Sequence, residues 1–160
     1  MKKIVTGIGY DSHKLVKGRR FVLGGVNIQS DICPKGHSDA DVLCHAIIDA
    51  VLGACSMSDI GTMFPDTDPK WKDANSIELL RKVGEIVSKE ASIIYIDAVV
   101  VLESIKLMPF IKEMNSNIAQ ALNMPVSSIN VKAKTNEGMG FIGRNEGISV
   151  IATASVERSL

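Results

Sequence analysis

The sequence predicts an α+β fold in which a single mixed sheet carries helices on one face. Segments with strand and helix character follow one another in the order β-β-α-α-β-α-β-β. Hydrophobic residues make up 46% of the 160 residues but aromatic residues only 4%, so we expect an aliphatic core. Several strands are apolar on both faces, and the sheet face without helices then needs a partner, most simply another copy of the chain. The length predicts one domain spanning residues 1–160.

The first two extended segments are both interrupted by glycines. A β-branched run over residues 3–10 predicts a strand that enters a turn at Gly7 and Gly9. Residues 21–28 form a second extended run. The glycine pair at 24–25 within it indicates a bulge or a close approach of another segment.

A helix is expected next, followed by a long irregular segment. Ser38 is predicted as the N-cap and Asp41 as the N3 residue, with its carboxylate near the positive helix end. Apolar residues continue this helix to about residue 55. Residues 56–73 contain two prolines and several aspartates, and loops of this length are usually lids or binding segments.

The second half of the chain alternates clearly between helices and strands. Asn75 and Glu78 resemble a capping box at the start of a helix that runs to about residue 89. Pro109 suits the first turn of a later helix. The remaining predicted elements are a strand at 92–102, a helix at 109–122, a strand at 129–134, a glycine-rich loop at 138–147 and a strand at 148–156.

Composition excludes several classes of protein. Eighteen basic and 18 acidic side chains give no net charge, which argues against a nucleic-acid-binding module. No apolar segment is long enough to span a membrane, and the first residues do not form a signal peptide. Three cysteines without a CxxC motif predict no disulfide framework and a reducing compartment. Cys44 and Cys55 are expected to be buried apolar residues.

Three side chains near the start of the chain suggest a metal site. Asp11 and His13 would point to the same side of an extended segment, and His45 lies on the predicted helix. Two histidines and one aspartate with an open fourth position are typical of catalytic zinc. The alternative for His45 is a core histidine whose hydrogen bonds are satisfied.

Asp41, His45 and Asp49 are spaced i, i+4 and i+8, and therefore share one stripe of the helix. If His45 binds a metal, Asp49 or Asp41 is expected to orient its ring. The alternative is that both aspartates simply lie on the helix surface.

Two further segments carry polar groups suited to a phosphorylated sugar. Residues 66–68 are either an Asp-rich turn or a site for sugar hydroxyls. The glycine-rich loop could aim backbone N–H groups at phosphates, and Glu137 beside it could hold Mg²⁺. Residues 7–12 lack the third glycine of a dinucleotide-binding motif and open no helix, which excludes that fold.

Together these segments resemble one family. GIGYDSH (7–13), GHSDADVLCHA (36–46), GTMFPDTDP (61–69), VKAKTNE (131–137) and GFIGR (140–144) are similar, in order and separation, to the motifs of 2-C-methyl-D-erythritol 2,4-cyclodiphosphate synthases of the non-mevalonate isoprenoid pathway. The resemblance covers about residues 3–157, and it is compatible with a bacterial cytoplasm or, for a processed organellar form, a plastid stroma. It implies a phosphorus–oxygen lyase that cyclises 4-diphosphocytidyl-2-C-methyl-D-erythritol 2-phosphate and releases CMP.

The resemblance also implies a homotrimer in a chorismate-mutase-like or ferredoxin-like layout. Its sheets would pack around a central channel, with active sites between neighbouring subunits. Asp11, His13 and His45 match zinc ligands, one ion per subunit, and Glu137 matches the ligand of a second cation, Mg²⁺ or Mn²⁺. His37 and Thr135 match catalytic residues.

The remaining matches are substrate contacts. Ser38 corresponds to a phosphate contact, Asp59, Ile60 and Gly61 to a ribose-binding turn, and Leu102, Lys106, Leu107 and Met108 to a cytosine pocket supplied by the neighbouring subunit. The loop over the methylerythritol part corresponds to Phe64, Pro65, Asp66, Thr67 and Asp68. Further substrate contacts correspond to Asp11, His13, His37, Lys134, Thr135, Asn136, Glu137, Phe141 and Arg144.

The chain departs from the family at three positions. Glu103 and Ile105 stand where Gln and Pro are usual in the cytosine segment, and Lys134 stands where Thr is common. Arg144 and Glu146 match residues lining the trimer channel, where some members hold an isoprenoid diphosphate. Two rival functions are a zinc phosphohydrolase that releases CMP to water and a non-enzymatic trimeric binder of isoprenoid diphosphates.

Overall fold

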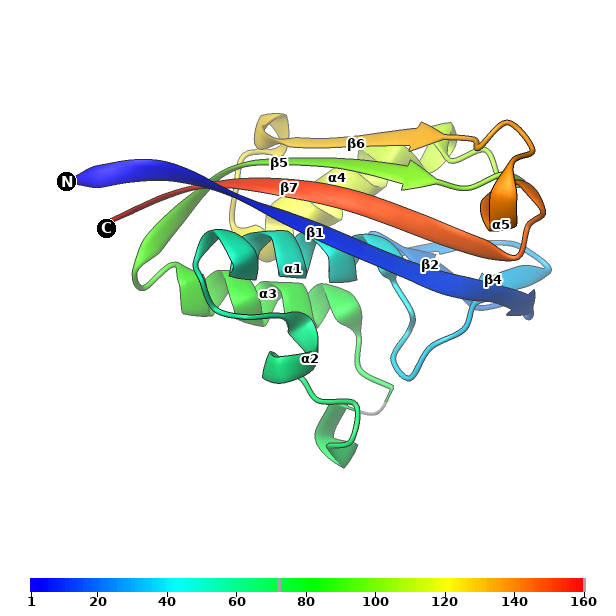
Figure 1. Cartoon of the computed structure of the whole chain (residues 1–160), viewed down its shortest axis with the longest axis horizontal. Coiled ribbons are helices and arrows are strands. Elements are labelled where there is room, and N and C mark those ends of the chain that lie inside the picture. The colour runs from blue at the N-terminus through cyan, green and yellow to red at the C-terminus, as the bar shows by residue number, and fades with distance from the viewer. Residues whose placement is uncertain (72, 160) are drawn as a thin grey trace.

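The computed structural model describes residues 1–71 and 73–159 and has the expected α+β architecture (Figure 1). Its strands are β1 (Lys2–Lys17), β2 (Phe21–Leu23), β3 (Val26–Ile28), β4 (Ile32–Pro34), β5 (Ala91–Val101), β6 (Ile129–Lys134) and β7 (Gly147–Ser159). Its helices are α1 (Val42–Ala54), α2 (Ile60–Met63), α3 (Ser76–Val87), α4 (Met108–Leu122) and α5 (Gly140–Gly143), with 3₁₀ turns at Pro69–Trp71 and Val126–Ser128.

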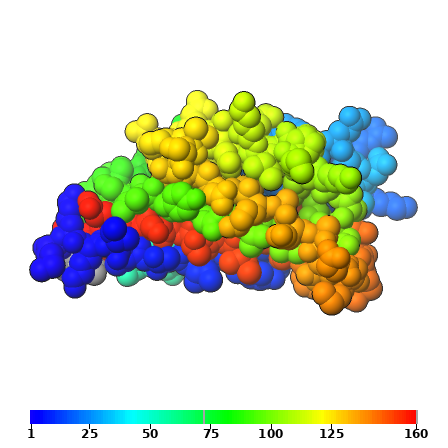
Figure 2. Space-filling view, turned by 90° about the horizontal axis from the view of Figure 1, so that it is seen from above, coloured from blue at the N-terminus to red at the C-terminus, as the bar shows by residue number. Residues whose placement is uncertain are grey.

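The main sheet is mixed, with the strand order β4-β1-β7-β5-β6. β5 and β6 pair in parallel, and the other neighbours are antiparallel. From above, β1, β7, β5 and β6 form adjacent bands in this order (Figure 2). Because β5 and β6 are parallel and joined through α4, the segments that follow them leave the sheet at the same edge.

β1 is longer than predicted, because Gly7 and Gly9 do not make a turn. The strand pairs with β7 along its length, from Lys2 opposite Ser159 to Lys14 opposite Gly147. A Cβ atom on Gly7 or Gly9 would lie 2.0 Å from the Ala50 carbonyl oxygen or 1.9 Å from that of Ala46. The glycines therefore allow the backbone of α1 to lie directly against β1, which brings the two elements of the candidate site together.

The run at 21–28 is a hairpin rather than one extended strand with a bulge. The close approach predicted as the alternative at the glycine pair is confirmed, because a Cβ atom on Gly24 would lie 2.8 Å from the Met114 Cβ atom. Gly24 and Gly25 have φ angles of 56° and 71°, as in a two-residue turn that requires left-handed backbone. Their N–H groups donate to the buried carboxylate of Asp41 at 2.9 and 2.8 Å. The short strand β4, which was not predicted, pairs with the end of β1.

The first long helix begins later than predicted. Asp41, rather than Ser38, is the N-cap of α1, and its side chain accepts the Cys44 N–H at 3.0 Å. Ala40 has φ 56°, so the chain cannot be helical there, and the Ser38 hydroxyl accepts the Ala40 N–H instead. This cap uses the same carboxylate that holds the hairpin, and it fixes hairpin and helix to each other.

The predicted long loop contains two short helical segments. α2 begins after Asp59, whose side chain accepts the Thr62 N–H at 2.8 Å, and a 3₁₀ turn covers Pro69–Trp71. Residue 72, within the predicted 56–73 loop, lies outside the described residues. Asn75 caps α3 as predicted, but Glu78 pairs with Arg81 rather than completing a capping box.

The later elements follow the predictions closely. β6 has the predicted bounds, α4 starts one residue earlier with its proline in the first turn, and β7 extends three residues further than expected. The glycine-rich loop contains α5.

The core lies between the sheet and its helices. α1 is buried on nearly all sides, and Cys44 and Cys55 are buried at 0% and 5% exposure, as predicted. Large apolar side chains alternate on the other side of β1 and continue on β7: Ile4, Ile8, Tyr10 and Ile151 are 42–70% exposed. An exposed apolar strip thus runs along β1 and the adjoining part of β7 on the face of the sheet opposite α1, while Asp97 and Lys132 form an exposed ion pair on β5 and β6. Among the described residues, no helix has the length and apolar character needed to cross a membrane.

Candidate metal centre and adjoining pocket

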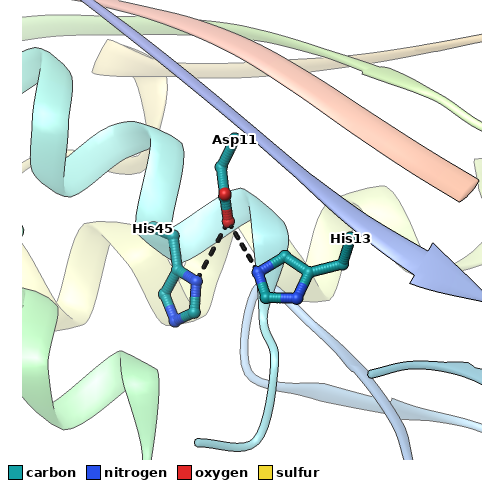
Figure 3. A group of neighbouring side chains, drawn as sticks. All are labelled: Asp11, His13 and His45. Atoms are coloured by element: carbon teal, nitrogen blue, oxygen red, sulfur yellow. Dashed lines mark hydrogen bonds and ion pairs between the residues drawn. The ribbon is translucent and has the colours of Figure 1, made fainter. Parts of the chain in front are cut away.

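Asp11, His13 and His45 meet between β1 and α1 (Figure 3). His13 Nε2 and His45 Nδ1 each lie 3.0 Å from Asp11 Oδ2. One ligand atom of each residue lies within 4.8 Å of the others, and all three residues are partly buried. The sequence prediction that these three side chains converge is confirmed.

The backbone fixes the tautomer of His13. Its Nδ1 atom lies 2.7 Å from the Lys35 carbonyl oxygen, which can only accept a hydrogen bond. Nδ1 therefore carries the proton in the neutral ring, and Nε2 presents its lone pair to Asp11.

Side chains fix the tautomer of His45 in the opposite sense. The Ser76 hydroxyl donates to the Asp39 carboxylate and lies 2.8 Å from His45 Nε2. Since the hydroxyl proton is used by Asp39, Ser76 Oγ accepts the proton of His45 Nε2, and Nδ1 keeps its lone pair. Ser76 is 0% and Asp39 6% exposed, so this chain of hydrogen bonds is shielded from water.

The carboxylate behind His45 is therefore Asp39, and the prediction of Asp49 or Asp41 was wrong. The Asp41 side chain holds the hairpin and the α1 terminus. Asp49 accepts the Ile60 N–H at 2.7 Å, and burial raises its pKa. No local spacing could reveal Asp39, because it acts through Ser76, 31 residues from His45.

The electrostatics of the cluster favour a cation. Burial raises the pKa of Asp11, but hydrogen bonds and charge interactions with His13 and His45 outweigh it and lower the pKa to about 2. The hydrogen bond with Asp11 in turn raises the pKa of His13. With both imidazoles neutral, three lone-pair atoms face one another, which is unfavourable unless a proton or a metal ion lies among them. The donor set fits a divalent metal such as zinc.

A cavity of about 310 Å³ opens beside the cluster. It joins predicted residues from four segments: β1, α1 with the residues before it, α2 and the following loop. Its lining comprises His13, His37, Ser38, His45, Ile60, Gly61, Phe64, Asp66, Trp71 and Leu79. Trp71 and Leu79 were not predicted. Trp71 packs edge-on against Phe64 with ring centroids 4.9 Å apart, and the single tryptophan within a polar loop was the signal that could have identified it.

Other predicted substrate residues in the long loop have structural partners. Asp59 caps α2, and the Asp68 side chain accepts the Lys70 N–H at 2.9 Å, which is the Asp-rich turn expected as the alternative. Pro65 and Thr67 lie in the same loop without lining the cavity.

A second group of predicted residues lies at the edge where β5 and β6 end. Thr135 Oγ1 donates to Glu137 Oε1 at 2.7 Å, and Asn136 and Lys134 are their neighbours. Leu102 and Leu107 are buried and Met108 is 83% exposed, while Lys106 is an exposed neighbour. None of these lines the cavity beside the metal cluster.

The glycine-rich loop uses its amides internally. The N–H groups of Asn136 and Gly138 donate to Glu103, and those of residues 143–146 donate to carbonyls of the same segment. Phe141 lines a cavity of about 530 Å³ together with His13, and Arg144 pairs with Glu146 at 2.9 Å. Within the predicted loop at 138–147, the N–H groups of Gly138 and of residues 143–146 thus have partners in the protein itself. For the other residues of the loop, phosphate binding through backbone N–H groups stays a prediction.

Comparisons with known proteins show the family to which the chain belongs. The model of the YgbB family matches residues 4–157. A 2-C-methyl-D-erythritol 2,4-cyclodiphosphate synthase of Syntrophus aciditrophicus is 53% identical over 96% of this chain and 97% of its own. The synthase of Salinibacter ruber is 51% identical over 94% of this chain and 97% of its own.

Solved structures show the same likeness. The bifunctional IspDF of Campylobacter jejuni superposes with a TM-score of 0.94 at 43% identity, over 99% of this chain and 43% of that one. The 2C-methyl-D-erythritol 2,4-cyclodiphosphate synthase of Plasmodium vivax gives a TM-score of 0.84 at 31% identity, over 99% of this chain and 100% of that one.

Proposed function

Because the chain belongs to the YgbB family, we propose that it converts 4-diphosphocytidyl-2-C-methyl-D-erythritol 2-phosphate into 2-C-methyl-D-erythritol 2,4-cyclodiphosphate and CMP. The observation that carries the proposal is the convergence of Asp11, His13 and His45 beside a pocket, in a chain about half identical to such synthases. In this reaction an oxygen of the 2-phosphate forms a bond to the β-phosphorus, the bond from that phosphorus to the CMP phosphate breaks, and CMP leaves with the electron pair. The enzyme is then a cyclising phosphorus–oxygen lyase.

We assign zinc to Asp11, His13 and His45, and Mg²⁺ or Mn²⁺ to Glu137. Two imidazoles and one carboxylate suit zinc, and Mg²⁺ commonly takes one protein carboxylate plus substrate phosphates. Bound there, the cations would offset the negative charge of the transferring group.

The residues of the chain supply binding and orientation. A phosphate is already a competent nucleophile, so the main obstacles are charge repulsion and ring closure. His37 and Thr135 would donate hydrogen bonds to the transferring phosphate, and Ser38 would hold the diphosphate. Phe64 and Trp71 would cover the methylerythritol part and exclude water.

The proposed assembly is a homotrimer of single-domain subunits with active sites between neighbours. Two observations support it: the exposed apolar strip on β1 and β7, and the fact that none of residues 102–108 lines the cavity beside Asp11, His13 and His45. A neighbouring subunit would bring its own residues 102–108 to that cavity and bind the cytosine. Arg144 and Glu146 would then line the central channel, where an isoprenoid diphosphate could bind.

The test is the product. Phosphorus NMR of the reaction should show a cyclic diphosphate and CMP, and a chelator should abolish both. A linear diphosphate would instead identify a zinc phosphohydrolase, and a protein that binds no zinc would favour a non-enzymatic binder.

A further inference from the structure

Glu103 joins two segments that the sequence separates by more than thirty residues. Its Oε2 atom accepts the Asn136 N–H at 2.8 Å and its Oε1 atom accepts the Gly138 N–H at 3.1 Å. Both carboxylate oxygens are thus used, one for each amide on either side of Glu137.

The sheet topology brings these groups together. Val101, the last residue of β5, lies opposite Lys134, the last residue of the parallel strand β6. The Leu102 N–H continues the pairing by donating to the Lys134 carbonyl at 2.9 Å. Glu103 therefore leaves the sheet directly beside the loop that carries Thr135 and Glu137.

The loop has a backbone conformation that needs support. Glu137 and Gly138 have φ angles of 52° and 75°, and a residue other than glycine in this left-handed region costs about 1 kcal/mol or more. Successive N–H groups in such a turn form a concave anion-binding site. Here that site is filled by the carboxylate of Glu103, an anion from the chain itself.

We propose that Glu103 is a positioning residue that holds Glu137 and Thr135 in the geometry needed for the transferring diphosphate. The Thr135 hydroxyl already donates to Glu137, so a shift of the backbone between residues 135 and 138 moves both groups. The inference rests on the proposed function, because it assigns Glu137 to the second cation and Thr135 to the phosphate. Glu103 itself need not touch either one.

The hydrogen-bonding groups of the two side chains explain why glutamate suits this position better than glutamine. A carboxylate accepts at both oxygens, whereas a glutamine amide would present an NH₂ group to one of the two N–H donors. Glu103→Gln should therefore keep one hydrogen bond and lose the other, and Glu103→Ala should lose both.

The first measurement is hydrogen–deuterium exchange in peptides that contain Asn136 and Gly138. Glu103→Ala should raise the exchange rate about tenfold or more, Glu103→Gln should raise it less, and Glu113→Ala, at an exposed glutamate of α4, should leave it unchanged. Unchanged exchange in Glu103→Ala would overturn the inference. Glu103→Gln keeps the side-chain volume and provides the comparison if Glu103→Ala does not fold.

The second measurement concerns the cation. In Glu103→Ala, kcat should fall at least tenfold and the Mn²⁺ concentration for half-maximal activity should rise; because Glu103 belongs to the segment assigned to cytosine, a change in KM alone would not support the positioning role. Electron paramagnetic resonance should show weaker Mn²⁺ binding. Faster exchange with unaltered kcat and Mn²⁺ binding would overturn the positioning role. Absence of cyclic product with the unsubstituted enzyme would overturn the proposed function, while the exchange data would still decide the contact of Glu103 with the loop.

Discussion

Replacing Ser76 with alanine should weaken metal binding without removing a metal ligand. Ser76 Oγ lies 2.8 Å from His45 Nε2, and its hydroxyl donates a hydrogen bond to the Asp39 carboxylate. The substitution leaves the Nε2 proton without this acceptor, so the ring is free to rotate and to exchange tautomers. The backbone N–H of Ser76, which donates to Asp39 at 3.0 Å, is retained.

The magnitude follows from the role of this contact. Loss of a partner that orients a metal-binding histidine typically lowers metal affinity 10- to 100-fold, which is about 1.4–2.7 kcal/mol. Ser38 Oγ lies 3.3 Å from the same nitrogen and offers a weaker substitute acceptor. We therefore expect the lower end of this range for Ser76→Ala and a larger loss for the double change with Ser38→Ala.

Zinc affinity measured by competition with a chromophoric chelator tests this expectation. Ser88→Ala is the matched control. Ser76 begins α3 and Ser88 directly follows its end, where the Ser88 hydroxyl donates to the Glu85 carbonyl at 2.9 Å, outside the site. Urea unfolding separates the two effects of the change, because a buried carboxylate that loses a donor costs about 1–3 kcal/mol of stability. If stability falls while zinc affinity stays within twofold of the unsubstituted protein, the tautomer argument is wrong.

Three further predictions concern the candidate metal centre and the strand β1 that carries two of its residues. His45→Ala should abolish zinc binding and product formation, while sedimentation shows the same assembly as before; dissociation would mean that the centre is structural. Gly9→Ala should destabilise the fold by about 3 kcal/mol or more, because its Cβ would lie 1.9 Å from the Ala46 carbonyl oxygen; urea unfolding with a loss below 1 kcal/mol would contradict the close packing of β1 on α1. In the presence of a chelator, the Asp11 carboxylate should contribute about 2 kcal/mol to the free energy of unfolding. This contribution is present above about pH 4 and is lost as the pH falls toward 2, because folding lowers the pKa of Asp11 from 3.8 to about 2. His13 has the opposite pH dependence, because folding raises its pKa. Its contribution to the stability of the fold is complete below about pH 6.5 and is lost as the pH rises further. Asp11→Asn should flatten the acid limb of a stability–pH profile, and an unaltered limb would refute this assignment.

Local sequence patterns predicted the elements whose determinants are local. β6 and α4 carry their own alternation, proline position and length, and the structure reproduces them almost residue for residue. The three candidate metal ligands were also found, because i and i+2 on a strand and a histidine on an apolar helix are local signals.

The failures come from contacts made between distant segments. Gly7 and Gly9 suggested a turn, but glycine is required there because the backbone of α1 leaves no room for a side chain. Ala40 gives no sequence signal for its left-handed backbone, so the start of α1 was placed too early. Ser76 and Glu103 act through hydrogen bonds to residues more than thirty positions away, which no periodicity can reveal.

The pairing of β1 with β7 also constrains the order of events during synthesis. β1 is synthesised long before β7, its main partner, and Lys2 and Glu157 are linked across 155 positions. Contacts of such large sequence separation form slowly, and an unpaired strand edge favours aggregation until they do. Asp11 and His13 lie on this strand, so the three side chains of the candidate site are held in place only after β7 has been synthesised and has paired with β1.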